Sequence, residues 1–291
     1  MNPGCLRVAL TDEAAGAPPD GEIVADLLWW HGATAIAERA DGDVVVLEAG
    51  FVNDETAREA AARVGERFPG LEIAVLDAEP ALEVALDAWR AHARPVRVGG
   101  VHVRYPWLAV DDEPPTGGEV VVVLDPSRAF GSGSHPSTRA CLRAVARLAG
   151  PGTSVLDVGC GTGVLAVTAA CLGAGPVVAI DVDPAAVAAT RANAAANGVA
   201  VDASTAELGA VPGFFDLVVA NIGAATLVAL AGDIAPHVAP GGVLVLAGLL
   251  RVQASEVAAA YARCGLHLGS EERDEGWVAQ QLRRASTTPT T

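Results

Sequence analysis

The chain has 291 residues, of which 51% are hydrophobic, and this suits one large domain or two modest ones. It contains no run of 18 apolar residues, so a membrane span is not expected, and the start MNPGCLRVAL lacks the pattern of a signal peptide. We therefore expect a cytoplasmic protein. The formal net charge of −16 disfavours nucleic acid as a direct partner and favours a basic one, although acidity for solubility alone would give the same value.

The cysteines are scattered, odd in number and without a C-x-x-C pair. This spacing disfavours both a disulfide framework and a zinc site, so we assign no metal. We interpret them as small buried hydrophobes. They are Cys5, Cys141, Cys160, Cys171 and Cys264.

Residues 1–79 are predicted to form a small α+β domain with the β-α-β-β-α-β order of a ferredoxin-like fold. No glycine loop or acid–base cluster occurs there, which favours a binding or positioning module over a catalytic one. A turn at Asp41-Gly42 joins two of the strands, and Asn53 or Asp54 is the expected cap of the second helix. Strands are expected at 5–10, 33–39, 43–51 and 71–77, and helices at 20–31 and from the cap to Phe68.

Residues 80–118 are predicted to connect this domain to a larger one through a helix at 80–94, a strand or hairpin, and a loop at 111–118. From 119 to 285 apolar strands and helices alternate, which predicts a parallel sheet with helices on both faces. The polar tail 286–291 is expected to be disordered. The strands are expected at EVVVVL (119–124), SVLDVG (154–159), PVVAID (176–181), FDLVVAN (215–221) and GGVLVLAGLL (241–250).

The stretch VLDVGCGTGVLAV is predicted to be a buried strand, a tight turn and the start of a helix. Glycines at 159, 161 and 163 let a backbone approach a ligand without clashes of Cβ atoms. Asp181 ends the next strand, 181 − 159 = 22 residues after Gly159. This is close to the spacing of about 20 residues at which an acid binds ribose hydroxyls in dinucleotide folds. The spacing GxGxG, rather than GxGxxG, favours S-adenosylmethionine (SAM) over NAD.

Asn221 ends the strand FDLVVAN, at the edge of the sheet where open α/β folds bind ligands. Its carboxamide could hold the methionyl part of SAM or a substrate amine, or it could only cap a local turn. Enzymes that methylate nucleobase amino groups often have Pro-Pro and an aromatic residue after this position. The chain instead reads Ile-Gly-Ala, which disfavours a nucleic-acid substrate.

Four motifs together closely resemble the PrmA family, bacterial methyltransferases of ribosomal protein L11: LDPSRAFGSGSHPST (124–138), VLDVGCGTGVLAV (155–167), AIDVDP (179–184) and DLVVANI (216–222). The resemblance covers about residues 80–284. It implies a class I, Rossmann-like methyltransferase fold with SAM as cofactor, and a ferredoxin-like domain that recognises the substrate. By motif position, the family's cofactor contacts fall on Thr138, Gly159, Asp181 and Asn221, and the loop 125–138 is expected to cover SAM opposite the glycine turn.

The implied reaction transfers methyl groups to lysine side-chain or N-terminal amines of L11. No general base is evident, so catalytic residues are left unassigned, and a local structural role is expected for His135 and Asp216. The oligomeric state is left open, with a monomer expected. Two alternatives stay open: a methyltransferase of the same fold for another protein or a small molecule, and a non-catalytic SAM-binding module of ribosome assembly.

Overall fold

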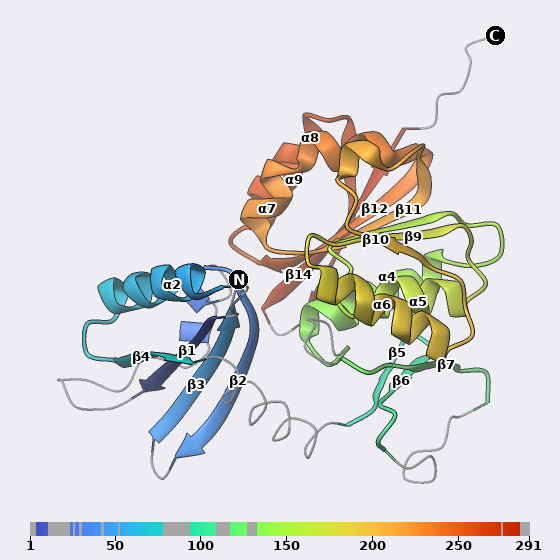
Figure 1. Cartoon of the computed structure of the whole chain (residues 1–291). Helices are drawn as coiled ribbons and strands as arrows, with labels where there is room; N and C mark the ends of the chain where they lie inside the picture. The colour runs from blue at the N-terminus through green and yellow to red at the C-terminus, as the bar shows by residue number, and fades with distance from the viewer. Residues whose placement is uncertain are drawn as a thin grey trace. The chain divides into compact units, whose positions relative to one another are not determined.

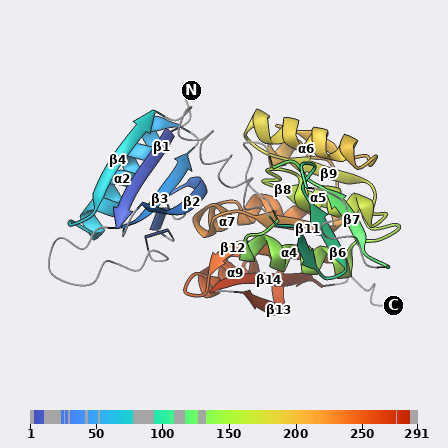
Figure 2. The same cartoon turned by 90° about the horizontal axis from the view of Figure 1, so that it is seen from below.

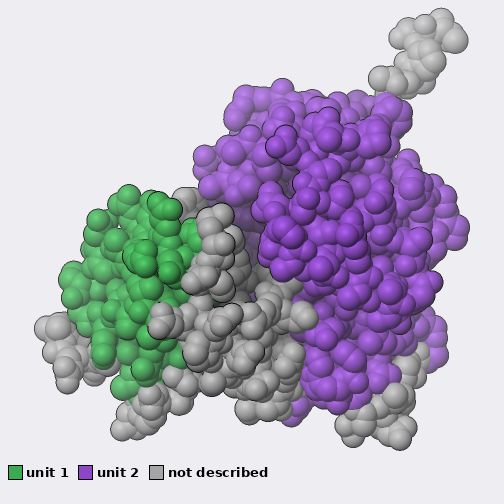
Figure 3. Space-filling view, in the orientation of Figure 1, with its two compact units in different colours: residues 1–93 green, residues 94–291 purple. Residues whose placement is uncertain are grey.

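The chain separates into two compact units, residues 1–93 and residues 94–291 (Figure 3). The boundary lies inside the segment 80–118, which we predict to connect two domains. The predicted helix at 80–94 lies almost entirely outside the described residues, and so does the predicted tail. The structure, a computed structural model, describes residues 4–10, 24–25, 27–28, 31–41, 44–51, 53–77, 94–108, 117–126, 133–274 and 276–285.

Unit 1 contains a four-stranded antiparallel sheet in the order β2-β3-β1-β4, with α2 packed on it (Figure 2). This order and pairing confirm the predicted ferredoxin-like fold. Within the predicted helix 20–31, residues 24–25 and 27–28 are helical, and its other residues before His31 lie outside the described part. The elements of this unit are β1 (Gly4–Leu10), β2 (Ala33–Asp41), β3 (Val44–Phe51), α2 (Asp54–Arg67) and β4 (Glu72–Asp77).

Helix α2 begins and packs as its sequence predicts. The Asn53 side chain caps it, since Asn53 Oδ1 accepts a hydrogen bond from the Thr56 backbone N–H at 2.9 Å. The helix buries Ala57, Ala60 and Val64, whose spacing places them on one face against β1, β3 and β4. Small side chains on this face let the helix lie close to the sheet.

Unit 2 is built on a seven-stranded sheet in the order β10-β9-β8-β11-β12-β14-β13. The strands from β10 to β12 are parallel, whereas β14 and β13 form an antiparallel pair at one edge. Its strands are β8 (Val155–Val158), β9 (Val177–Ile180), β10 (Asp202–Ser204), β11 (Phe215–Asn221), β12 (Val238–Leu250), β13 (Leu266–Asp274) and β14 (Trp277–Arg284).

Helices cover both faces of this sheet, as the alternating pattern predicts (Figure 1). One group, α4 to α6, packs over the first hydrophobic core, and the other, α7 to α9, packs over the second. The central strand β8 is therefore buried on both sides, whereas the edge strand β10 is partly exposed. The helical elements are α4 (Pro136–Leu148), α5 (Val164–Cys171), α6 (Pro184–Ala196), α7 (Ala224–Ala229), α8 (Ala231–Ile234), α9 (Ala254–Ala262) and two 3-10 turns, Leu208–Ala210 and Ala235–His237.

Two details of the predicted sheet are wrong. The sheet is mixed rather than parallel, because β13 and β14 are joined by a short turn, and only antiparallel strands can be joined so tightly. The predicted strand 119–124 does not join this sheet. It forms β7 (Val120–Val123) of a separate three-stranded sheet, in which it pairs with β6 (Val101–Arg104), and β6 pairs with β5 (Val96–Val98) as the predicted hairpin.

Asn193 of α6 and the C-cap residue Asn197 hold the edge of β7 and Asp125, two residues beyond it. Asn197 accepts a hydrogen bond from the Val123 backbone N–H at 2.8 Å and donates to the Val123 carbonyl at 2.7 Å. Asn193 makes the same pair of bonds with Asp125, each at 2.9 Å. The side-chain amides thus take the place of a neighbouring strand and fix the point where the loop before α4 begins.

Candidate active site

Three of the predicted site residues lie at the carboxyl ends of neighbouring strands in the seven-stranded sheet. Gly159 follows β8, Asp181 follows β9, and Asn221 ends β11, and these three strands are neighbours in the sheet. The fourth, Thr138, lies in the first turn of α4. The carboxyl ends of parallel strands are the usual place for a ligand in open α/β folds, so the arrangement suits a binding site.

The glycine turn is tight for reasons that lie within the chain itself. Gly159 has φ +73, and a Cβ there would overlap the Ile222 side chain. Gly163 has φ +78, and a Cβ there would lie 2.7 Å from the Thr190 hydroxyl. The sequence predicts the correct turn, but packing inside the chain already requires glycine at these two positions, apart from any approach of a ligand.

Asp181 holds the glycine turn with part of its carboxylate. Its Oδ2 accepts a hydrogen bond from the Gly161 backbone N–H at 2.9 Å, and its Oδ1 accepts one from the Asp183 N–H at 3.0 Å. A carboxylate can accept about four hydrogen bonds, so about two positions remain for a ligand. Val182, the next residue, is 95% exposed beside it.

Asn221 and Thr138 meet although 83 residues separate them. The Asn221 Nδ2 group donates to the Thr138 hydroxyl at 3.1 Å, and Thr138 is fully buried. The other end of the amide, Asn221 Oδ1, is buried and has no hydrogen-bond partner among the described residues. An unpaired buried acceptor is costly, so this oxygen is suited to receive a donor from a ligand.

Asp157 is a buried acid in the middle of this region that our sequence analysis does not single out. Its pKa is raised to about 7, chiefly by burial; a hydrogen bond from the Ala166 backbone N–H opposes the rise, and the negative charge of Asp181 adds to it. The bond from Ala166 joins Asp157 Oδ2 at 3.1 Å, while Oδ1 has no partner in the part of the chain that the structure describes. The sequence feature that could have pointed to Asp157 is an acid inside the apolar run VLDV.

His135 and Asp216 make local structural contacts of the kind that we expect for them. His135 caps α4, where its Nδ1 accepts a hydrogen bond from the Ser137 backbone N–H at 3.3 Å. Asp216 accepts hydrogen bonds from the Ser154 backbone N–H at 2.9 Å and from its hydroxyl at 2.6 Å, and these bonds lower the pKa of Asp216. Neither contact points to acid–base chemistry.

All five cysteines are free. Burial raises the pKa values of the Cys141 and Cys160 thiols, the two cysteines closest in sequence to the predicted site residues. Within the described ranges, no group of three His, Cys, Asp or Glu residues could hold a metal ion. The helices described by the structure are too short or too polar to cross a membrane.

The sequence model of the family described as ribosomal protein L11 methyltransferase (PrmA) matches residues 16–285. The chain belongs to this family. PrmA relatives named ribosomal protein L11 methyltransferase include one from Dechloromonas aromatica, 37% identical over 96% of this chain and 90% of the relative, and one from Myxococcus xanthus, 38% identical over 96% and 98%. A relative from Geobacter metallireducens is 45% identical over 65% of this chain, but this match spans only 62% of that protein.

The fold of the PrmA family is also found in a solved structure. The crystal structure of a ribosomal protein L11 methylase from Lactobacillus delbrueckii subsp. bulgaricus matches with a TM-score of 0.61 and 28% identity, covering 66% of this chain and all of that chain. The match confirms the predicted fold class of the larger unit. The roles of the four site residues and the predicted domain functions are untested by these comparisons and stay predictions.

Proposed function

We propose that this PrmA-family chain is a SAM-dependent protein methyltransferase, which transfers methyl groups to lysine side-chain or N-terminal amines of ribosomal protein L11. Membership of the family and the names of the relatives support this substrate. The observation that carries the proposal is the Asn221–Thr138 pair, with the buried Asn221 Oδ1 unpartnered among the described residues.

The residues at this edge of the sheet suit SAM. Asp181 has acceptor positions left for ribose hydroxyls, beyond the two backbone bonds that it already accepts. The Asn221 Oδ1 atom suits the ammonium group of the methionyl part, because that group carries only donors. When bound, SAM supplies an electrophilic methyl group on a positively charged sulfur.

The task of the chain is to bind and position a neutral amine. Lysine has a pKa of about 10.4, so holding it neutral at pH 7 costs about 4–5 kcal/mol. Removal of water around the amine lowers its pKa, and alignment of the two reactants supplies several kcal/mol more. We assign no general base. The net charge of −16 would speed the encounter with a basic ribosomal protein.

The test is intact mass spectrometry of purified L11 after incubation with the full chain and SAM. We expect mass gains in steps of one methyl group, which are lost in Asp181→Ala and retained in Asp233→Ala, an exposed acid on α8 that serves as the matched control. No gain in spite of calorimetrically measured SAM binding would refute L11 as the substrate. No SAM binding by the wild-type chain would refute the proposed activity as a whole.

A further inference from the structure

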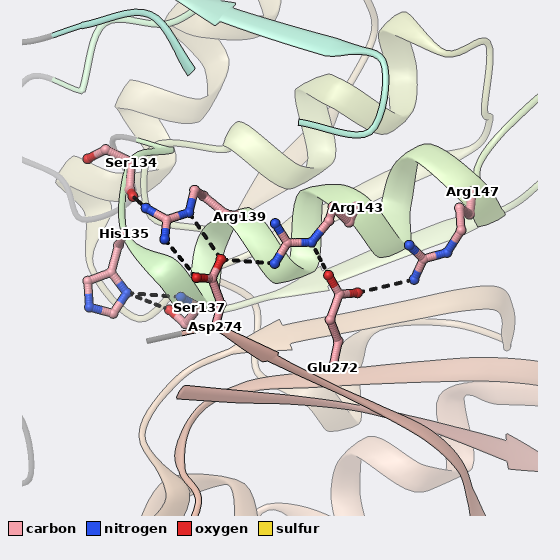
Figure 4. Close-up of polar contacts among 8 residues, drawn as sticks. All are labelled: Ser134, His135, Ser137, Arg139, Arg143, Arg147, Glu272 and Asp274. Atoms are coloured by element: carbon pink, nitrogen blue, oxygen red, sulfur yellow. Dashed lines mark hydrogen bonds and ion pairs between the residues drawn. The ribbon is translucent and has the colours of Figure 1, made fainter. Parts of the chain in front are cut away.

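The helix that carries Thr138 is tied to the β13–β14 hairpin by a ladder of ion pairs (Figure 4). Three arginines stand four residues apart along one face of α4, and two acids stand two residues apart on one face of β13. The matching spacings let each acid bridge two successive arginines. The five residues of this α4–β13 ladder are Arg139, Arg143, Arg147, Glu272 and Asp274.

Asp274 occupies the end of the ladder nearest to the candidate site. Arg139 donates a hydrogen bond to each of its carboxylate oxygens, from Nε to Oδ2 at 3.1 Å and from Nη2 to Oδ1 at 2.8 Å. Arg143 adds a third bond to Oδ2 at 2.9 Å. The Arg139 and Asp274 side chains are only 27% and 17% exposed, and such a two-point, partly buried pair restricts orientation more than a surface pair does.

Glu272 occupies the other end of the ladder. It pairs with Arg143 and, at 3.4 Å, with Arg147, whose side chain is 53% exposed. These contacts hold the second and third turns of α4, which are farther from Thr138. Glu272 therefore provides a matched comparison for Asp274, with the same charge, the same strand and the same helix.

The loop in front of α4 is attached at the same end as Asp274. The Arg139 Nη1 group also donates to the Ser134 carbonyl at 2.9 Å, so one guanidinium joins the hairpin, the helix and the loop. The His135 ring meets the Trp277 ring edge-on, with 4.6 Å between the centroids, and Trp277 begins β14. Figure 4 shows Ser134, His135 and Arg139 gathered at one end of the helix. Two separate contacts thus fix this end of the loop to the hairpin.

Thr138 is joined to these attachments through the chain and to the Asn221 amide through a hydrogen bond. It precedes Arg139 in the chain, and the first turn of α4 is closed by the Arg139 backbone N–H, which donates to the His135 carbonyl at 2.9 Å. A movement of Arg139 therefore moves the Thr138 hydroxyl, and the 3.1 Å bond to Asn221 leaves little room for such a movement.

We propose that Asp274 is a positioning residue for the candidate cofactor site, which acts through Arg139 to keep Thr138 in contact with Asn221. The proposal rests on the proposed function, because it assumes that SAM binds at this edge of the sheet. It assigns a role in cofactor binding to a residue of the β13–β14 hairpin. In the bonds described above, Asp274 contacts none of the predicted cofactor residues directly.

The test compares Asp274→Asn with Glu272→Gln in the full chain. Asparagine keeps the shape of Asp274 but removes its charge and one of the two oxygens that accept hydrogen bonds from Arg139. We expect Asp274→Asn to raise the Kd of S-adenosylhomocysteine, measured by calorimetry, by about tenfold, a loss common for residues that orient ligand-binding side chains. Glu272→Gln should change this Kd by less than about twofold.

A double-mutant cycle separates positioning from a general loss of stability. If Asp274 acts through Thr138, then Asp274→Asn should weaken binding in the wild type but add little in a Thr138→Val background. Additive losses of the two substitutions would overturn the proposal. So would equal losses of affinity in the Asp274 and Glu272 variants, because the ladder would then act only as a brace for the fold.

Hydrogen exchange of the ligand-free chain keeps the test independent of the proposed activity. We expect Asp274→Asn to speed exchange in peptides covering the first turn of α4, and Glu272→Gln to leave that turn protected. If the wild-type chain did not bind S-adenosylhomocysteine, the proposed function would fall, and the exchange pattern would still decide whether Asp274 positions Thr138. Unchanged exchange in the Asp274 variant would overturn the positioning role.

Discussion

Relative to the wild type, the Asp157→Asn variant should be more stable in unit 2 above neutral pH than it is in acid. Asp157 is wholly buried, and its folded pKa is about 7 against 3.8 for the ordinary side chain. Between these two values the folded chain keeps a proton that the unfolded chain has released. Stability therefore falls as the pH rises through this window, and below 3.8 nothing is lost because both states are protonated.

The magnitude follows from the difference between the two pKa values. At about 1.36 kcal/mol per pK unit, the ionised Asp157 costs about 4 kcal/mol of stability once the pH exceeds both values. Asparagine does not titrate, and its amide oxygen can still accept the hydrogen bond from the Ala166 N–H. The unpaired NH₂ group that it introduces costs stability equally at every pH, so it does not change the slope.

Hydrogen exchange followed by mass spectrometry is the suitable assay, because the chain has two compact units and a single denaturation midpoint would mix them. Peptides from β8 and β11 report on unit 2. Comparing variant and wild type at the same pH cancels the intrinsic chemistry of exchange. The variant should gain protection progressively from about pH 5 to about pH 8. A difference that stays constant over this range would refute the assignment of a raised pKa to Asp157.

Two further substitutions test the frame around the site. Gly248→Ala, at φ +82, would bring a Cβ within 2.5 Å of the Ile222 carbonyl oxygen, so we expect it to displace the loop after β11. The Kd of S-adenosylhomocysteine, measured by calorimetry, should rise by at least about tenfold. Gly213→Ala, at φ +81 with open space around it, is the control for backbone strain. Asp216→Ala removes both bonds to Ser154 and should cost about 1 kcal/mol at neutral pH, measured by hydrogen exchange in peptides from β11. Because the folded pKa of Asp216 is lowered, its contribution fades as the pH falls through that value, and the variant should then unfold like the wild type; a gap that persists in acid would contradict this reasoning.

The three strand-end positions could be predicted from the sequence because each follows an apolar run. Gly159, Asp181 and Asn221 all stand where a buried strand stops, and neighbouring parallel strands bring such positions together. The contact between Thr138 and Asn221 could not be predicted from spacing, since it depends on how α4 packs across several strands. Only the family resemblance pointed to Thr138.

The β13–β14 hairpin was not predicted, because the sequence of β13 looks like a solvated segment. Strand β13 reads LHLGSEERD and is largely exposed, so it shows neither an apolar run nor a clear alternation. Its acids Glu272 and Asp274 find partners on a helix about 130 residues earlier in the chain. Similarly, the run VVVVL gives no sign of which sheet it joins, because a strand's own residues fix its burial but not its neighbour.

Asn197, the C-cap residue of α6, affects the tendency of the protein to aggregate at high concentration. Strand β7 and its surroundings, EVVVVL, combine β-branched residues with no proline, which are features of segments that recruit other chains into aggregates. Asn197 occupies the hydrogen-bonding groups of Val123 that an incoming strand would need. Asn197 also precedes Gly198, a sequence prone to deamidation, and the resulting carboxylate could no longer donate to the Val123 carbonyl. We therefore expect deamidation of Asn197 to leave the Val123 carbonyl at the edge of β7 open to a strand from another chain.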